Sequence, residues 1–294
     1  MILKSIINAL KGVLIGIANT IPGVSGGTIA VVTGIYDRMI GAVGGFFREH
    51  GGWKANLLFL GPIVIGVGAG ILGFARIVDF FLESYPEQTA LFFMGLIAGS
   101  VPFLAKKSIK DRFRWWYLIP LVLCLGALVV MRVVGRPPAS DPITTVTVYG
   151  VVMVFLSGVI SAAAMIIPGI SGSFILLLIG MYSTFINAAS DRNLVILGIF
   201  VAGSAVGIVV VAKLINLLLK HFHEPTYFAI IGLVVGSLVS IWPGLSGGAM
   251  SIVSVIAFAL GFVAAFFLGT DRKERAREAR EGADSEQNAS GGTD

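Results

Sequence analysis

The chain has 294 residues, of which 56% are hydrophobic and 13% are charged, and its formal net charge is +5. Its mean hydropathy is +0.93. So few charged side chains cannot cover a water-soluble globule, which excludes a soluble protein and predicts one that resides in lipid. The single cysteine, Cys124, excludes a disulfide framework within the chain and gives no thiol or zinc chemistry.

The first predicted element, within residues 5–45, is an apolar hairpin broken at Pro22-Gly23. Its uncharged part runs from Gly12 to Tyr36, so each limb rises only about 18 Å as helix, short of the roughly 30 Å hydrocarbon core. We therefore expect a re-entrant hairpin that enters and leaves by the same face. Unwound backbone at membrane depth is tolerated only beside protein or a water-filled cavity, which predicts an internal, functional position.

Apolar spans follow the hairpin, and the order then repeats. We expect a first repeat over residues 1–135, with spans near 55–82, 88–105 and 115–131, and a second over 140–270, with a hairpin at 143–190 and spans near 193–219, 226–242 and 249–268. The second hairpin has a longer charge-free stretch, so deeper penetration or an added segment stays open there. The charged tail, residues 271–294, is predicted to be disordered.

Internal duplication is the most informative feature of the sequence. Ile21-Pro22-Gly23-Val24-Ser25-Gly26-Gly27-Thr28 returns as Ile167-Pro168-Gly169-Ile170-Ser171-Gly172-Ser173-Phe174, and Gly34-Ile35-Tyr36 returns in the same register as Gly180-Met181-Tyr182. A second block pairs the Arg76 region with the Lys213 region, and Glu87 with Glu224. The sequence therefore consists of two related halves.

An odd number of crossings in each half implies that the halves insert upside down relative to one another, as in many transporters. The basic loop around Lys106 and Lys107 shares a predicted side with the Arg-rich tail, and the positive-inside rule places both in the cytoplasm. The expected fold is thus an all-α polytopic membrane protein. It has two inverted-topology repeats, each with a Pro-Gly-broken re-entrant hairpin and about three transmembrane helices.

The two hairpin tips have the chemistry of an anion site. Ser25 and Ser171 are good helix N-caps, and each precedes a helix start whose backbone N–H groups are predicted to be free for an anion. Inverted topology would bring the tips together near mid-membrane. The alternative is that each motif is only a tight turn for close helix packing. Two copies at equivalent positions favour binding. The predicted phosphate-binding tip residues are Ser25, Gly26, Gly27, Thr28, Ser171, Gly172 and Ser173.

Three cations are further candidates for the site. Arg76 and Lys213 occupy equivalent places inside predicted spans, where a buried cation is retained if it pairs with a partner such as an anionic substrate. Snorkelling to the interface is an equally good interpretation of each one alone. Arg38, at the end of the first hairpin, is predicted to be an interfacial cation within reach of an arriving head group.

An enzyme is disfavoured, because a membrane phosphatase or glycosyltransferase needs a histidine or paired-carboxylate constellation. The three histidines, His50, His221 and His223, lie in predicted loops, and most acidic residues lie outside the spans. A small-anion secondary transporter or channel would use the same paired helix starts and stays open as the alternative. No metal, cofactor or nucleic acid is expected. Coupling to protons or sodium and a homo-oligomeric state are left open.

The doubled motif, Ile21 to Tyr36 and Ile167 to Tyr182, resembles the signature of the polyprenyl-phosphate (undecaprenyl phosphate) translocase family, long catalogued as a domain of unknown function. The likeness covers about residues 5 to 268. It implies a flippase in the bacterial or archaeal cell membrane that moves undecaprenyl phosphate from the outer to the cytoplasmic leaflet. This lipid carrier would then be recycled in cell-envelope synthesis, with membrane lipids as the surroundings.

Overall fold

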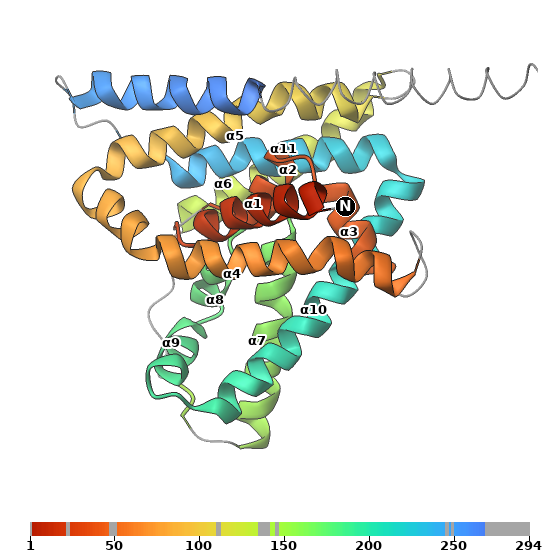
Figure 1. Ribbon diagram of the computed structural model, residues 1–294, viewed down its shortest axis with the longest axis vertical. Helices are drawn as coiled ribbons and strands as arrows, with labels where there is room; N and C mark the ends of the chain where they lie inside the picture. The colour runs from red at the N-terminus through yellow and green to blue at the C-terminus, as the bar shows by residue number, and fades with distance from the viewer. Residues whose placement is uncertain are drawn as a thin grey trace, which may run out of the picture.

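The computed structural model describes residues 2–21, 24–46, 52–109, 113–134, 142–144, 147–244, 247 and 250–267, and within these ranges it is helical without strands (Figure 1). The helices are α1 (Ile2–Asn19), α2 (Gly26–Val32), α3 (Tyr36–Gly44), α4 (Trp53–Ser84), α5 (Pro86–Ser108), α6 (Leu118–Val134) after a short 3-10 turn (Trp115–Tyr117), α7 (Val148–Ile166), α8 (Gly172–Leu178), α9 (Tyr182–Ser190), α10 (Leu194–His221), α11 (His223–Ile241) and a C-terminal helix (Met250–Phe267).

Six of the described helices are long and apolar enough to cross a membrane, and the bent pair α8 and α9, which meet at 114°, would count as a seventh span. The six are α5, α7, α10, the C-terminal helix, residues 53–74 of α4 and residues 115–133, which include α6. The predicted class, an all-α polytopic membrane protein, is therefore confirmed. The predicted tail, 271–294, and the Pro22-Gly23 break lie outside the described residues.

Glycines let helices pack backbone against backbone, and the pairs α1 with α4 and α7 with α10 do so in the same way. On α1, a Cβ at Gly12 would come within 2.2 Å of the Ile63 carbonyl oxygen of α4, and on α4 a Cβ at Gly66 would come within 2.1 Å of the Ala9 oxygen. The pair α7 and α10 repeats the arrangement, since a Cβ at Gly203 would lie 2.1 Å from the Phe155 oxygen. Small residues at such spacings are the usual means of close packing where lipid removes the hydrophobic drive between helices.

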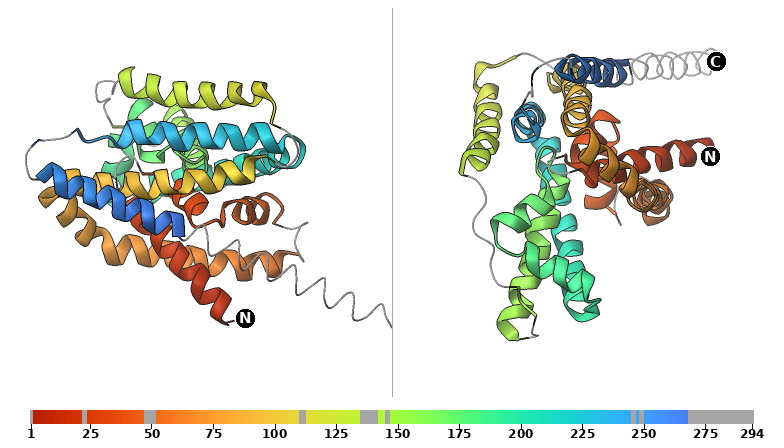
Figure 2. Two further views of the ribbon diagram at one scale, coloured as in Figure 1. Left: turned by 90° about the horizontal axis from the view of Figure 1, so that it is seen from above. Right: turned by 90° about the vertical axis from the view of Figure 1, so that its left-hand side faces the viewer.

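The two halves of the chain interleave rather than lying side by side. Helix α5, from the first half, packs against the C-terminal helix, because a Cβ at Gly95 would meet the Phe258 carbonyl oxygen at 2.0 Å. Conversely α11, from the second half, packs against α6 at Gly232 and Leu121. The right-hand view of Figure 2 shows α7 to α10 as one group below the remaining helices.

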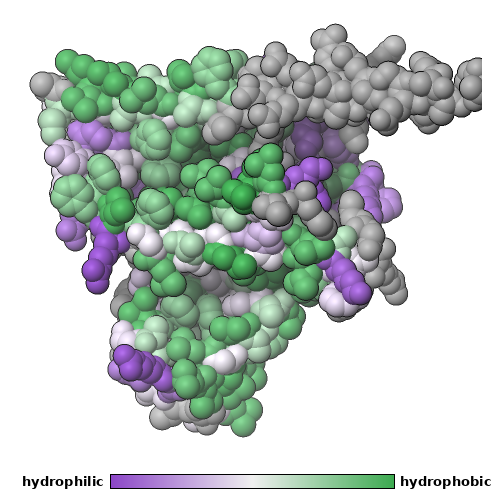
Figure 3. Space-filling view, viewed as in Figure 1, coloured by the Kyte–Doolittle hydropathy of each residue, from purple (hydrophilic) through white to green (hydrophobic). Residues whose placement is uncertain are grey.

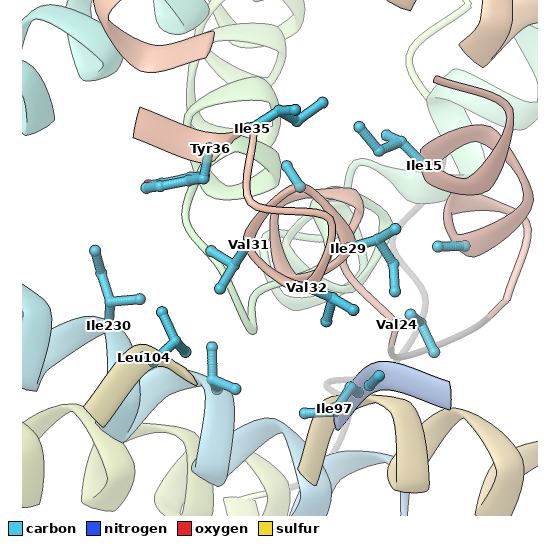
Figure 4. Close-up of a cluster of buried hydrophobic side chains, with 14 of the residues drawn as sticks. Ile15, Val24, Ile29, Val31, Val32, Ile35, Tyr36, Ile97, Leu104 and Ile230 are labelled. Carbon is cyan, nitrogen blue, oxygen red and sulfur yellow. The ribbon is translucent and has the colours of Figure 1, made fainter. Parts of the chain in front are cut away.

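The core of the molecule surrounds α2, the short helix after the first break. All seven of its residues are buried. Figure 4 shows Val31 and Val32 of α2 facing Leu104 and Ile97 of α5, with Ile15 of α1 on the other side. The face of the molecule in Figure 3 is instead largely apolar, with hydrophilic residues gathered in small groups. A buried broken helix inside an apolar exterior is the arrangement expected of a protein solvated by lipid.

Each hairpin contains a second break that the sequence interpretation did not assign. The limb after the tip ends at Val32 in the first copy and at Leu178 in the second, and a new helix starts at Tyr36 and at Tyr182. Gly34 and Gly180 lie at these breaks with φ of 59° and 72°, values that glycine adopts at little cost. The repeated Gly-x-Tyr sequence therefore marks a turn into α3 and α9.

Candidate functional site

The structure brings the two copies of the duplicated motif into direct contact. The Ser25 hydroxyl donates a hydrogen bond to the Ile167 carbonyl oxygen at 3.4 Å, and the Gly169 amide donates to the Thr28 hydroxyl at 2.8 Å. These bonds join residues 142 and 141 positions apart in the chain. The start of α2 thus lies against the turn between α7 and α8. Gly27 permits this contact, because a Cβ there would come within 2.8 Å of the Ile166 oxygen.

The first tip is closed in this structure. Ser25 occupies the predicted N-cap position of α2, but its side chain makes no capping bond, and Ser25 and Thr28 are only 2% and 0% exposed. The prediction that the Gly26 amide is free was wrong, because it donates to the Asn19 side-chain oxygen at 3.0 Å. Asn19 ends α1 and folds back over the tip. A side chain of the preceding helix therefore takes the place that an anion would need.

The second tip is open by comparison. Ser171 is the N-cap residue of α8, again without a capping bond, and its hydroxyl lies 2.9 Å from the hydroxyl of Ser173, an exposed residue. Gly172 is buried between them, and its carbonyl oxygen accepts a bond from Ser161 of α7 at 3.1 Å. Two hydroxyl groups are thus presented together at the start of α8.

The three predicted cations are not gathered at the tips. Arg76 on α4 and Lys213 on α10 are both exposed, and in the described part of the chain neither forms an ion pair or hydrogen bond with a tip residue. Arg38 on α3 is also exposed, and its guanidinium carbon lies 4.1 Å from the centre of the Phe59 ring. These positions fit side chains that extend toward a boundary between lipid and water.

A second polar group, which the sequence interpretation missed, lies at the far end of α2. Here Asp37 at the start of α3 forms an ion pair with Lys107 at the end of α5, and the same carboxylate oxygen accepts a hydrogen bond from Tyr227 of α11. The sequence held one signal. Asp37 stands where the second repeat has Ser183, so the charge breaks an otherwise close duplication.

In the described residues, no group of three or more His, Cys, Asp or Glu side chains is placed to hold a metal ion. What the two tips offer chemically is hydroxyl groups and helix-start amides. Such donors can bind an anion.

Known proteins resemble this chain over most of its length. A family profile described as undecaprenyl phosphate translocase-like matches residues 15–254. A polyprenyl-phosphate transporter of Staphylococcus aureus is 35% identical over 273 residues, which cover 90% of this chain and 95% of that protein. A polyprenyl-phosphate transporter of Vibrio cholerae is 33% identical over 252 residues, which cover 80% and 76% respectively. No solved structure matches the chain.

Both relatives are bacterial and both are named as transporters. Their names, the six apolar helices and the family match agree on a multi-pass membrane transporter rather than an enzyme. The chain belongs to the undecaprenyl phosphate translocase-like family.

Proposed function

We propose that this protein transports a polyprenyl phosphate, and that its main substrate is undecaprenyl phosphate. Transport would run from the outer to the cytoplasmic leaflet, so that the lipid carrier is recycled in envelope synthesis. Two bacterial relatives named as polyprenyl-phosphate transporters support the substrate. The observation that carries the site is the contact between the two duplicated tips, Ser25 to Thr28 and Ile167 to Ser173.

Such a transporter has to shield only the phosphate head group from the hydrocarbon. Moving a phosphate through hydrocarbon is prohibitive without polar partners, whereas the isoprenoid chain is at home in lipid. A protein needs only a polar site for the head group that is open sideways to the bilayer. We propose that the site lies where the tips meet, and that inverted repeats present it alternately to the two leaflets.

In this proposal the Ser171 and Ser173 hydroxyls make the first contact with the phosphate. The amides of Gly27 and Thr28 lie in the first turn of α2, so they have no partner within that helix and can donate to a phosphate oxygen. They become accessible when the Ser25 to Ile167 and Thr28 to Gly169 contacts separate. The closed first tip would then correspond to a state without substrate.

The proposal is tested by reconstituting the purified protein in liposomes that contain a fluorescent short-chain polyprenyl phosphate. A reductant that cannot cross the membrane then bleaches only the outer-leaflet probe. With active protein, bleaching should extend from the outer-leaflet share to nearly the whole pool. Replacement of both tip serines, S171A with S173A, should slow this exchange, while S190A at the exposed end of α9 serves as the matched control.

Lack of exchange by a folded protein would count against lipid transport. In that case, uptake of radiolabelled inorganic phosphate into liposomes free of polyprenyl lipid would favour the small-anion transporter instead. In cells lacking the protein, an unchanged amount of undecaprenyl phosphate on the outer surface would contradict the proposed direction.

A further inference from the structure

The polar group at the far end of α2, which we term the Asp37 cluster, comprises Tyr36, Asp37, Lys107, His223 and Tyr227. All of its members except His223 line a small open pocket, whose apolar walls include Val31, Leu104 and Ile230. Figure 4 shows these three residues and Tyr36 around the same space. Four helices, α2, α3, α5 and α11, therefore converge on one pocket.

Three hydrogen-bond donors belong to this pocket. The Lys107 ammonium and the Tyr227 hydroxyl both bind the same oxygen of Asp37. The third donor, the Tyr36 hydroxyl, is buried in a residue that is 3% exposed, and it has no hydrogen-bond partner among the described residues. Buried hydroxyl groups are normally paired, so an unpaired one beside a pocket points to a ligand that supplies the missing acceptor.

The cluster is held in place by the surrounding helices. The His223 ring nitrogen Nε2 lies 3.2 Å from the Lys107 carbonyl oxygen, and the rings of His223 and Tyr227 are 4.6 Å apart. Tyr227 is 2% exposed, whereas the side chains of Lys107 and Asp37 are 42% and 36% exposed. The tyrosines are thus fixed, and the ion pair is the part that can open.

Three members of the cluster are not repeated at the aligned positions of the other half. Asp37 aligns with Ser183, and in the second repeat alignment Tyr227 pairs with Ala90 and Lys107 with Gly244. The pocket next to the equivalent turn of the second half is lined mainly by apolar residues such as Met181 and Phe185. These three residues, which have no counterpart of the same type in the other repeat, therefore meet at one place in the structure.

We propose that the Asp37 cluster is a second anion site that binds a phosphate monoester, with the Asp37 carboxylate occupying the place of the phosphate in this structure. A phosphate offers three acceptor oxygens, enough for Lys107, Tyr227 and Tyr36 together, while one oxygen of Asp37 serves only the first two. The pocket lies one seven-residue helix, about 10 Å, from the Ser25 tip. It is placed to receive a head group that leaves the tips or approaches them.

This inference rests on the proposed function for the identity of the ligand, but its test is a binding measurement that needs no transport. The probe is farnesyl phosphate added to the detergent-solubilised full chain, with farnesol as the uncharged comparison and inorganic phosphate as the free anion. Binding of both phosphates would mark a general anion site, and binding of farnesyl phosphate alone a lipid head-group site. Either result supports the site if the variants below behave as stated.

Substitutions of Lys107 and Asp37 should change the affinity for farnesyl phosphate in opposite directions. K107M should weaken binding about tenfold, whereas K106M, the same change on the exposed neighbour, should leave it within about twofold. D37N should tighten binding several-fold, because the competing carboxylate charge is removed. Y36F should weaken binding a few-fold without lowering the unfolding temperature, since the hydroxyl has no partner to lose.

A purely structural ion pair predicts a different pattern, in which D37N and K107M weaken binding equally or leave it unchanged. Either result would overturn the second site. Because K107M leaves the Asp37 charge without its cation, the double variant D37N with K107M restores neutrality and should fold normally yet still bind weakly. If these variants bind normally while S171A with S173A abolishes lipid exchange, the second site fails and the proposed function stands.

Discussion

The two hairpin tips have nearly the same sequence but opposite environments. The first is buried under Asn19 of α1 and pressed against the turn of the second copy, and the second presents Ser171 and Ser173 outward. The residue aligned with Asn19 is Met165, whose side chain cannot accept a hydrogen bond of comparable strength. One difference between the repeats thus accompanies a closed tip in the first copy and an open tip in the second.

The largest effect is expected where the second turn is fixed by its backbone. Gly169 has a φ of +85°, and a Cβ there would lie 2.3 Å from the Leu233 carbonyl oxygen of α11. Gly169→Ala therefore combines a left-handed backbone penalty of about 1–2 kcal/mol with overpacking of about 1–3 kcal/mol. Thermal unfolding in detergent should show a loss of roughly 2–5 kcal/mol.

The control for this substitution is Gly198→Ala on α10, where a Cβ would meet nothing within 4 Å. It should change stability by less than about 1 kcal/mol, in the stabilising direction if at all. Equal unfolding temperatures for the two variants would show that the turn is not held against α11.

A smaller effect is expected at the bond between the tips. Thr28→Val keeps the shape of the side chain but removes the acceptor for the Gly169 amide, and leaving a buried donor unpaired costs about 1–3 kcal/mol. Ser173→Ala at the exposed tip should cost less than about 0.5 kcal/mol. The two are compared by thermal unfolding, and a larger loss for Ser173→Ala would reverse the assignment of closed and open tips.

Asn19→Met makes the first tip resemble the second. It removes the acceptor for the Gly26 amide, which is comparable to the loss of a helix cap and should cost about 1 kcal/mol. Asn187→Met, on an exposed face of α9, is the matched control and should be near neutral. Faster hydrogen exchange at Gly26 in the Asn19 variant would confirm that this side chain closes the tip, and unchanged exchange would refute it.

The smallest effects on stability are expected for Arg76→Gln and Lys213→Gln, because both side chains are exposed and each change should be worth less than about 0.5 kcal/mol. The informative measurement for these two variants is the lipid-exchange assay in liposomes. If these cations pair with the phosphate during transport, exchange falls while the unfolding temperature stays constant. If they only extend to the interface, both measurements remain at the level of the unaltered protein.

Particular residues show how far the sequence could predict the site. Pro168-Gly169 and the serines after each Pro-Gly pair marked two helix starts, because a missing amide and a flexible residue act on their immediate neighbours. The N-cap positions of Ser25 and Ser171 were accordingly correct. The use of the Gly26 amide by Asn19 was missed, since it depends on how α1 folds back over the tip.

The sequence by itself determined that this protein resides in a membrane, that it is helical, and that each of its two repeats carries a broken helix. These properties follow from composition and from the backbone preferences of single residues. Only the tertiary structure decided that the tips touch, that one is closed, and that Asp37 meets Lys107 and Tyr227, which are 70 and 190 positions away. Such partners are chosen by the packing of whole helices, which no local pattern records.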